Sequence, residues 1–288
     1  MLSRDERVLV AGAGGFIGGH LAGYLAAQGF TAIRAADVRP VARWFQVLAQ
    51  AESVQLDLSD AAAVRTAADG CGYVIDLIAG EQPAATMRTA AAALLAAAGA
   101  AGASRLLRGA PAGHVRDEDA AGVRTDAGPA TRSVRYAGVY GSHGPWHGGR
   151  EPLPVRLSRK VAEALLAGAD EIELRGDGAD AGTFLHVDDC VRGILAVMES
   201  DQAEPAILAG TEIVTVDELL DVIEEIAGVR LKRRYTRARP ARADAASGTP
   251  PRRPAGWSPE ISLADGMART YAWVFEQVNA RSLTGRRG

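Results

Sequence analysis

The sequence is poor in lysine and cysteine. Its 288 residues include only two lysines, Lys160 and Lys232, and two cysteines, Cys71 and Cys190. Two cysteines are too few for a disulfide framework or a zinc cluster, so we expect both to be reduced packing residues and expect no metal site. The scarcity of lysine also leaves only two positions for a catalytic lysine.

Long apolar runs and a strong charge imbalance are absent too. No segment is long and apolar enough to cross a bilayer, and residues 3–7 are polar, unlike a signal peptide. The formal net charge of −3 gives no electrostatic reason to bind nucleic acid or an anionic membrane. We therefore expect a cytoplasmic protein without nucleic-acid or membrane partners. The length fits one large domain or two smaller ones.

A glycine-rich turn lies near the start of the chain. An apolar run over residues 7–11 is followed by Gly12, Gly15 and Gly18, and then by an amphipathic stretch, His20–Gln28. Gly12 permits a tight turn, Gly15 lets the backbone approach a pyrophosphate, and Gly18 lets a helix pack on the strand. The free amides at the helix N-terminus favour phosphates. The predicted dinucleotide-binding residues of this turn are Gly12, Gly15, Phe16, Ile17 and Gly18.

The ends of the next two strands supply candidates for the adenosine half of a dinucleotide. Asp37 follows the glycine turn by about twenty residues, and its carboxylate is placed to accept both ribose hydroxyls, which favours NAD. Arg39 is placed to meet a 2′-phosphate, which leaves NADP open. Asp57 is expected to contact the adenine amino group, with Leu58 beside it. Ser59 is expected to cap the next helix.

Strands and helices alternate through the first part of the chain. Strands are predicted over residues 7–11, 31–36, 54–56, 73–79 and 105–108, and helices over 60–68 and 84–98. This alternation predicts an α/β fold with a doubly wound parallel sheet, in which ligands lie at the carboxyl ends of the strands. Leu77, Ile78 and Ala79 are therefore expected to line the path of the cofactor.

Three later stretches carry a family resemblance. Residues 133–141, residues 183–189 and the segment Gly256–Pro259 with the helical region after it resemble the extended short-chain dehydrogenase/reductases, the NAD-dependent epimerase/dehydratase family. Residues 29–46 look like its GDP-mannose epimerase branch. The resemblance implies a Rossmann domain over 1–142, completed by about 182–200, a mostly substrate-binding part over 143–288, and NADH or NADPH as the cofactor. It also implies cofactor contacts from Gly109, Ala110, Tyr136 and Val139.

The chain departs from the family at the catalytic residues. The family pairs a proton-donating tyrosine with a lysine four residues later, which lowers the pKa of the tyrosine and binds the nicotinamide ribose. None of the six tyrosines here has a lysine at that spacing. Because only residues 109–131 separate the fifth strand from the sixth, we expect the helix that carries the pair to be deleted. Ala110 and Pro111 replace the family's serine or threonine pair, so no catalytic residue is predicted.

Three functions remain open. The main prediction is an atypical ketoreductase that transfers hydride without a protein acid and takes the proton from water or from a substrate hydroxyl beside the ketone. In this respect the chain resembles atypical ketoreductases that act on angucyclinone-type aromatic polyketides in antibiotic biosynthesis. The second function is a non-catalytic nicotinamide-binding sensor or scaffold. The third is a nucleotide-sugar epimerase.

The predicted substrate pocket follows the fifth and sixth strands. Its expected residues are His114, Tyr140, His143 and Trp146. Because the walls implied by the family are shortened, the pocket should be wide and suited to a flat polycyclic molecule. The deleted helix normally contributes to the family's dimer interface, so we expect a monomer or an unusual dimer.

The C-terminal half is expected to alternate between helices and short strands. Helices are predicted over 157–166, 188–199, 216–227 and 263–273, and a strand over 171–175. Thr215 or Asp217 is expected to cap the third of these helices. The basic segment 230–242 is predicted to be a solvated face, 243–254 a loop, and 282–288 a frayed end.

Overall fold

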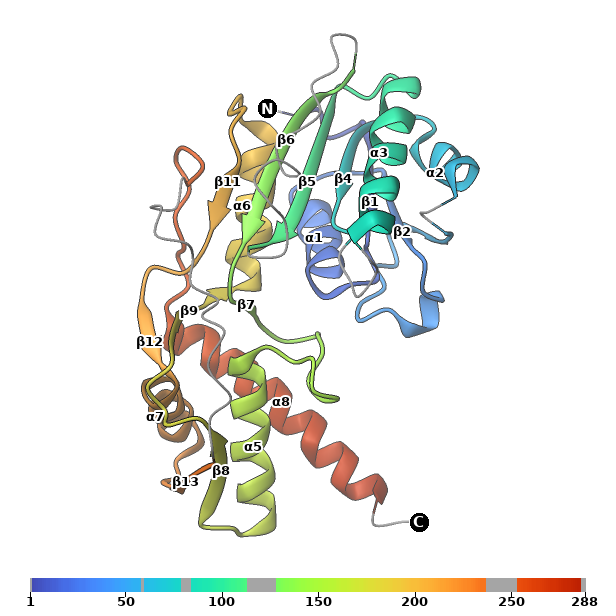
Figure 1. The fold of residues 1–288 in the computed structure, drawn as a ribbon. Helices are drawn as coiled ribbons and strands as arrows, with labels where there is room; N and C mark the ends of the chain where they lie inside the picture. Colours follow the sequence, from blue (N-terminus) through green and yellow to red (C-terminus); the bar gives the residue numbers. More distant parts are fainter. Residues whose placement is uncertain (1, 58–59, 79–83, 113–127, 237–252, 286–288) are drawn as a thin grey trace. The chain divides into compact units, whose positions relative to one another are not determined.

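A computed structural model describes residues 2–57, 60–78, 84–112, 128–236 and 253–285 of the chain (Figure 1). The chain forms two compact units. The first comprises Met1–Tyr136, Asp188–Leu208 and Pro250–Ser258. The second comprises Ala137–Val187, Ala209–Thr249 and Pro259–Gly288.

The described residues of the first unit form a seven-stranded parallel sheet. Its strands are β1 (Arg7–Ala11), β2 (Ile33–Asp37), β3 (Glu52–Gln55), β4 (Cys71–Asp76), β5 (Arg105–Pro111), β6 (Ala130–Tyr136) and β11 (Ala206–Leu208). Their order is β11-β6-β5-β4-β1-β2-β3, and each neighbouring pair is parallel. The strand order therefore reverses between β1 and β4, as in a doubly wound Rossmann sheet, which confirms the predicted fold class.

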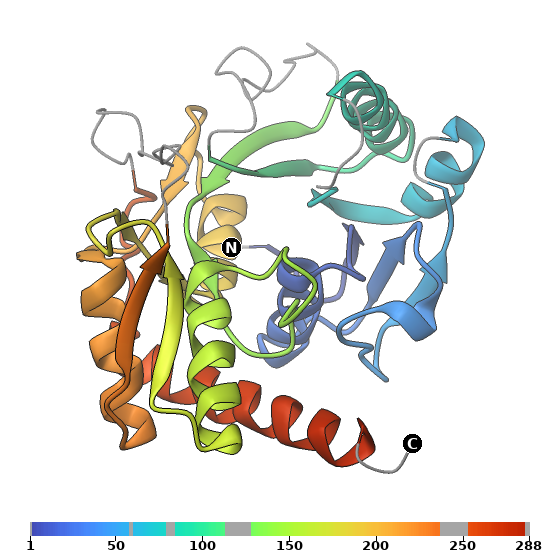
Figure 2. The same ribbon diagram turned by 60° about the horizontal axis from the view of Figure 1, so that its bottom comes forward.

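Helices cover both faces of this sheet (Figure 2). They are α1 (Phe16–Ala27), α2 (Ala61–Ala68), α3 (Ala84–Ala100) and α6 (Val187–Glu199). On the face covered by α2 and α3, Leu9, Val74 and Leu94 are fully buried in one apolar cluster. Figure 2 shows α1 and α6 on the opposite face. Burial on both faces explains why the central strands β1 and β4 are largely apolar instead of alternating.

Several predicted boundaries shift in the structure. Helix α1 begins at Phe16, directly after the glycine turn, so the amphipathic stretch predicted its second half. Helix α2 is capped by Asp60, whose carboxylate accepts a hydrogen bond from the amide of Ala62 at 2.8 Å. The predicted cap, Ser59, lies outside the described residues. Strand β4 ends at Asp76, three residues earlier than predicted.

The second unit packs three helices around an apolar core. They are α5 (Leu153–Ala167), α7 (Val216–Ala227) and α8 (Leu263–Gly285), and buried leucine, valine and isoleucine side chains from α5 and α7 meet Met267 and Val274 of α8. Its short strands pair as β7 (Val139–Tyr140) with β10 (Leu185–His186), β8 (Glu171–Arg175) with β13 (Lys232–Thr236), and β9 (Ala181–Thr183) with β12 (Ile213–Thr215). The capping box of α7 uses Thr215 and Glu218, which confirms Thr215 as the cap.

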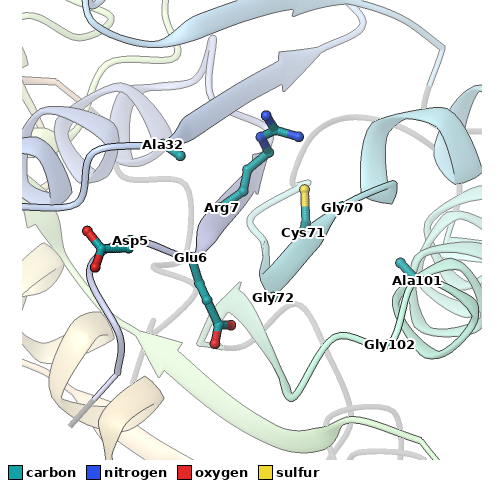
Figure 3. Close-up of a pocket in the computed structure, with 9 residues that line it drawn as sticks. All are labelled: Asp5, Glu6, Arg7, Ala32, Gly70, Cys71, Gly72, Ala101 and Gly102. Atoms are coloured by element: carbon teal, nitrogen blue, oxygen red, sulfur yellow. The ribbon is translucent and has the colours of Figure 1, made fainter.

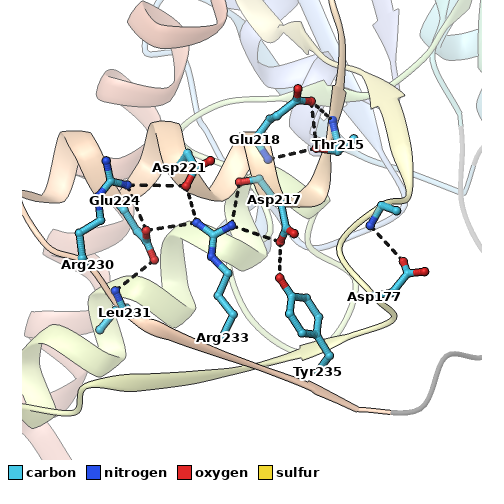
Figure 4. A network of polar contacts seen from close by, with 11 residues as sticks. Asp177, Thr215, Asp217, Glu218, Asp221, Glu224, Arg230, Leu231, Arg233 and Tyr235 are labelled. Atoms are coloured by element: carbon cyan, nitrogen blue, oxygen red, sulfur yellow. Dashed lines mark hydrogen bonds and ion pairs between the residues drawn. The ribbon is translucent and has the colours of Figure 1, made fainter.

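The basic segment is more ordered than its charge suggests. Arg233 of β13 lies among Asp217, Asp221 and Glu224 of α7, and forms ion pairs with all three (Figure 4). Glu224 also accepts hydrogen bonds from Arg230 and from a backbone amide. Through residue 236, these arginines pair with carboxylates of the same unit rather than facing only water. The loop predicted over 243–254 lies almost wholly outside the described residues.

The structure also tests the predictions for the cysteines, the C-terminal end and membrane-spanning segments. Cys71 and Cys190 are free and buried, which confirms that they are packing residues. Ser282 lies inside α8, which continues to Gly285, so the prediction of a frayed end from 282 was wrong over these residues. Within the described ranges, no helix has the length and apolarity needed to cross a membrane.

Candidate functional site

The glycine turn lies at the point where the strand order reverses. Gly12 has φ +87°, and a Cβ there would lie 2.6 Å from the carbonyl oxygen of Leu77, at the end of β4. A Cβ on Gly18 would collide with the carbonyl oxygen of Gly12. Gly15 precedes α1 as its N-cap, and its amide donates to the Gly12 oxygen at 3.0 Å. Gly12 and Gly18 therefore each have a structural reason to lack a side chain.

The first turn of α1 leaves its backbone amides open to an anion. The N-cap Gly15 supplies no side-chain hydrogen bond, and the first turn holds no acidic residue. Phe16 and Ile17, which were predicted to contact the cofactor, are both half-buried in this turn. Their amides belong to the group that has no partner within a helix, so they are suited to bind phosphate oxygens.

Asp37 and Arg39 form an ion pair beside the turn. The Asp37 carboxylate, 4% exposed, accepts from the Gly14 amide, from the Arg39 amide and from Nε and Nη2 of Arg39, at 3.0–3.1 Å. Trp44 donates from its indole to the Arg39 carbonyl at 2.9 Å, and its ring lies over Gly14. Trp44 is buried against the turn and lies just after a short 3₁₀ helix, Val41–Arg43.

Asp57 stands at the outer side of this region. Its side chain is exposed, and its carbonyl accepts from the amide of Asp60 at 3.1 Å. Leu56, just before it, donates its amide to the carbonyl of Asp37 at 3.1 Å, so the ends of β2 and β3 are tied together. Contact between Asp57 and an adenine stays a prediction. Leu58 lies outside the described residues.

The carboxyl end of β4 carries a buried acid that the sequence analysis missed. Asp76 is 6% exposed, and its Oδ1 accepts from the amide of Ile78 at 3.0 Å. Burial raises the pKa of Asp76, although that hydrogen bond and Arg108, 3.6 Å away, act in the opposite direction. The sequence signal that could have revealed it is an acidic residue inside an otherwise apolar run. Leu77 is buried beside it, and Ala79 lies outside the described residues.

The end of β5 carries no hydroxyl side chain. The strand includes Gly109, Ala110 and Pro111, so the prediction that it ends at Arg108 was wrong. Gly109 is needed because a Cβ there would lie 2.5 Å from the side chain of Leu77. Residues 113–127, which hold His114 and most of the segment in which a helix deletion was predicted, lie outside the described residues.

Tyr136 stands next to Gly109 on β6. Its ring would lie 3.3 Å from a Cβ at Gly109, and the residue is 7% exposed. Burial raises the pKa of Tyr136, and the nearby Asp76 and Cys190 act in the same direction. A phenol that holds its proton this firmly is a poor general acid near neutral pH. The burial of Tyr136 therefore argues against it as a replacement for the missing tyrosine–lysine pair.

The remaining predicted site residues, the cofactor contact Val139 and the pocket residues Tyr140, His143 and Trp146, belong to the second unit. Val139 and Tyr140 form β7, and Tyr140 is only 1% exposed, with its ring edge-on to His186. The structure therefore gives Tyr140 a packing role. His143 and Trp146 lie in the loop after β7; His143 is exposed, has φ +55° and contacts the ring of Trp273. Trp146 packs against the apolar core of this unit.

A cavity among the described residues lies at the opposite edge of the sheet. It has a volume of about 550 Å³ and is lined by Asp5, Glu6, Arg7 and Cys71 at the amino ends of β1 and β4, with glycines between them (Figure 3). The strands are parallel, so this edge is remote from the glycine turn. The cavity is therefore separate from the candidate site.

Comparison with known proteins assigns the family. The model of the NAD dependent epimerase/dehydratase family matches residues 8–121 and 114–210. The chain belongs to this family. NAD(H) or NADP(H) is the family's cofactor class, in agreement with the prediction, and solved structures similar to this chain include complexes with NAD and NADH.

Curated relatives of the chain include enzymes named for GDP-linked sugars. It is 30% identical over 161 residues to GDP-mannose 3,5-epimerase 1 of Oryza sativa, a match that covers 56% of this chain and 42% of the relative. It is 30% identical over 162 residues to GDP-L-fucose synthase of Escherichia coli, covering 50% of this chain and 49% of the relative. The chain thus aligns with less than half the length of these relatives.

Solved structures reproduce the fold over nearly the whole chain. UDP-glucose 4-epimerase of Thermotoga maritima has a TM-score of 0.75 at 19% identity and covers 94% of this chain and 99% of its own. The enzyme of the same name from Thermus thermophilus, in complex with NAD, has a TM-score of 0.71 at 19% identity, with 93% and 98% coverage. At this identity the likeness shows the fold alone.

Proposed function

We propose that this chain binds a nicotinamide dinucleotide at the Gly12–Gly18 turn and acts on a sugar carried by a nucleoside diphosphate. The observation that carries the proposal is the glycine cradle at the reversal of strand order, where a Cβ on Gly12 or Gly18 would strike backbone atoms. The sugar-nucleotide class rests on family membership and on the similarity to enzymes named for GDP-mannose and GDP-L-fucose.

The residues of the turn fit such a cofactor. The amides of the first turn of α1 would hold the pyrophosphate, and the Asp37–Arg39 pair would meet the adenosine ribose. Gly109 leaves room beside Leu77 at the carboxyl end of the sheet. When bound, the nicotinamide supplies hydride transfer to or from a carbon of the substrate.

The chain must obtain its proton in another way than its family does. The sequence holds no tyrosine with a lysine four residues later, and the end of β5 offers alanine and proline in place of hydroxyl groups. Alignment alone can supply about 7–11 kcal/mol of the barrier reduction. We infer that the proton comes from water or from a hydroxyl group of the substrate, and that the protein contributes alignment.

A second candidate is the reduction of a polycyclic aromatic ketone. The same absences favour it, because a phenol beside the ketone can supply the proton that the protein lacks. It requires no sugar-binding residues, and it ranks second because the curated relatives are enzymes of GDP-linked sugars. A nicotinamide-binding protein without catalytic activity is the outcome if neither substrate class reacts.

Turnover assays distinguish these functions. Purified protein is mixed with NADPH or NADH and a GDP-linked keto-hexose, and nicotinamide absorbance is followed; epimerisation of GDP-mannose is followed by chromatography. We expect turnover or epimerisation with the GDP-linked sugars and none with the corresponding free sugars. Turnover confined to a hydroxylated polycyclic ketone would replace the proposal with the second candidate. Cofactor binding without reaction of either class would contradict both enzymatic functions.

A further inference from the structure

The sequence leaves open whether the adenosine site takes NAD(H) or NADP(H), and the structure bears on this choice through the Asp37 carboxylate. An ionised carboxylate offers about four acceptor positions. Oδ1 accepts from the amide and Nε of Arg39, each at 3.0 Å. Oδ2 accepts from the Gly14 amide at 3.1 Å and from Nη2 of Arg39 at 3.0 Å. No position remains for the two ribose hydroxyls that Asp37 would have to accept in an NAD(H) complex.

The Arg39 guanidinium faces solvent. It is 38% exposed, whereas the side chain of Asp37 is 6% exposed, so solvent meets the cation and the carboxylate lies beneath it. An arginine has five N–H groups, and Asp37 takes two of them, so three are left for a ligand. Nη2 lies 3.5 Å from the position of a Cβ on Gly15, which places these donors beside the phosphate-binding turn.

Arg39 is held in place before any ligand binds. Its amide donates to Asp37, its carbonyl accepts from the Trp44 indole, and its guanidinium lies 5.8 Å from the ring centre of Phe45. Trp44 itself is fixed against Gly14. A planar guanidinium fixed in this way is suited to a phosphate, to which it can donate two parallel hydrogen bonds, and binding costs little ordering of the side chain.

We propose that the Asp37–Arg39 pair selects the 2′-phosphorylated cofactor, NADP(H), over NAD(H). The inference rests on the proposed function, since it assumes that a nicotinamide dinucleotide binds at the glycine turn. NAD(H) would have to displace Arg39 to reach Asp37, whereas the 2′-phosphate uses the donors that the pair leaves exposed. An aspartate at this position by itself favours NAD(H). The ion pair with Arg39 reverses that preference.

Binding calorimetry tests the inference without relying on activity. The wild-type protein should bind NADPH at least about tenfold more tightly than NADH, and adenosine 2′,5′-bisphosphate more tightly than 5′-AMP. Arg39→Ala should weaken NADPH binding by about tenfold to a hundredfold, as expected for losing charge-assisted hydrogen bonds. Its NADH affinity should be unchanged or higher, because Asp37 then becomes able to accept the ribose hydroxyls.

Two further variants make the test specific. Arg43→Ala removes an equal charge from an exposed position in the nearby 3₁₀ helix and should leave both affinities unchanged. Arg39→Gln keeps a donor for Asp37 and should fold if Arg39→Ala does not; it should also weaken NADPH binding. Equal affinities in the wild type, tighter NADH binding, or unchanged NADPH binding in both Arg39 variants would overturn the inference alone. Failure of the folded wild type to bind either dinucleotide would overturn the proposed function.

Discussion

At the scale of single residues, the glycines of α1 differ in what surrounds them. Gly18 faces the backbone of the turn, and a Cβ there would strike the carbonyl oxygen of Gly12 and the Cα of Ala13. Gly23, one and a half turns later in the same helix, has no atom within 4 Å of the corresponding position. The same substitution at the two sites therefore separates a packing requirement from helix propensity.

We predict opposite effects on stability at these two glycines. Gly18→Ala should lower the free energy of unfolding by about 1–3 kcal/mol or more, because backbone atoms must move to admit the methyl group. Gly23→Ala should raise it by roughly 0.5–1 kcal/mol, because alanine is the better helix former. Urea denaturation followed by circular dichroism measures both. Similar midpoints for the two variants would show that Gly18 does not pack against the turn.

The residue scale also shows where prediction from sequence stops. The spacing of Gly12, Gly15 and Gly18 was enough to predict the turn, because steric limits at each position act within a few residues. The sequence could name Asp37 and Arg39 as candidates but could not pair them. The pair is held by contacts from other segments, the Gly14 amide on Asp37 and the Trp44 indole on the Arg39 carbonyl. Asp76 was missed because its partners lie outside its own strand.

At the scale of elements, prediction succeeded where periodicity and caps agree. Strand β1 and helix α7 have the predicted bounds, since both have an apolar pattern and a distinct end signal. Helix α5 begins four residues earlier than predicted, because Pro152 and Pro154 look like breakers in sequence but are tolerated in the first turn of a helix. Strand β5 was predicted too short because a glycine and a proline stand at its end.

The attachment of β13 to α7 depends on one buried acid. Glu224 is 1% exposed and accepts from Arg230, Arg233 and the amide of Leu231, whereas the side chain of Asp221 is 57% exposed (Figure 4). Both carboxylates meet Arg233, so they form a matched pair that differs mainly in burial. The loss of charge-assisted hydrogen bonds at a buried carboxylate costs more than the loss of an exposed ion pair, which is screened by water.

Glu224→Gln should therefore destabilise the protein by about 1–3 kcal/mol, because Glu224 loses charge-assisted hydrogen bonds while Arg233 keeps Asp217 and Asp221 as partners. Asp221→Asn should cost no more than about 1 kcal/mol. Thermal unfolding and hydrogen exchange of the β13 amides measure the two effects, and exchange should be faster in the Glu224 variant. Equal small losses in both variants would show that β13 is held by its backbone pairing with β8 instead.

At the scale of the whole molecule, the fold class and the cofactor class followed from the sequence, and the substrate did not. Alternating strands and helices with a glycine turn specify a doubly wound sheet, and that sheet places ligands at its carboxyl edge. Substrate choice depends on side chains brought together from distant parts of the chain. The periodicity of a sequence does not reveal those contacts. The resemblance to polyketide ketoreductases rested only on the absence of the usual catalytic residues, and that absence is compatible with many substrates.

The central claim of this account is that the amides after Gly15 hold the phosphates of a nicotinamide dinucleotide. Gly15 is an N-cap in extended conformation, a position that favours both Asp and Asn, so Gly15→Asp and Gly15→Asn should both keep the fold. They differ by one negative charge at the place where the phosphates would lie.

The most direct test is fluorescence titration with NADPH, followed by energy transfer from tryptophan to the nicotinamide. We expect saturable binding to the wild type and weaker binding to Gly15→Asn, because its side chain hinders the approach of the backbone to the phosphates. The affinity of Gly15→Asp should be at least about tenfold weaker again than that of Gly15→Asn, because its charge repels the phosphates. Equal affinity of the folded Asp and Asn variants, or no saturable binding to the wild type, would contradict the central claim.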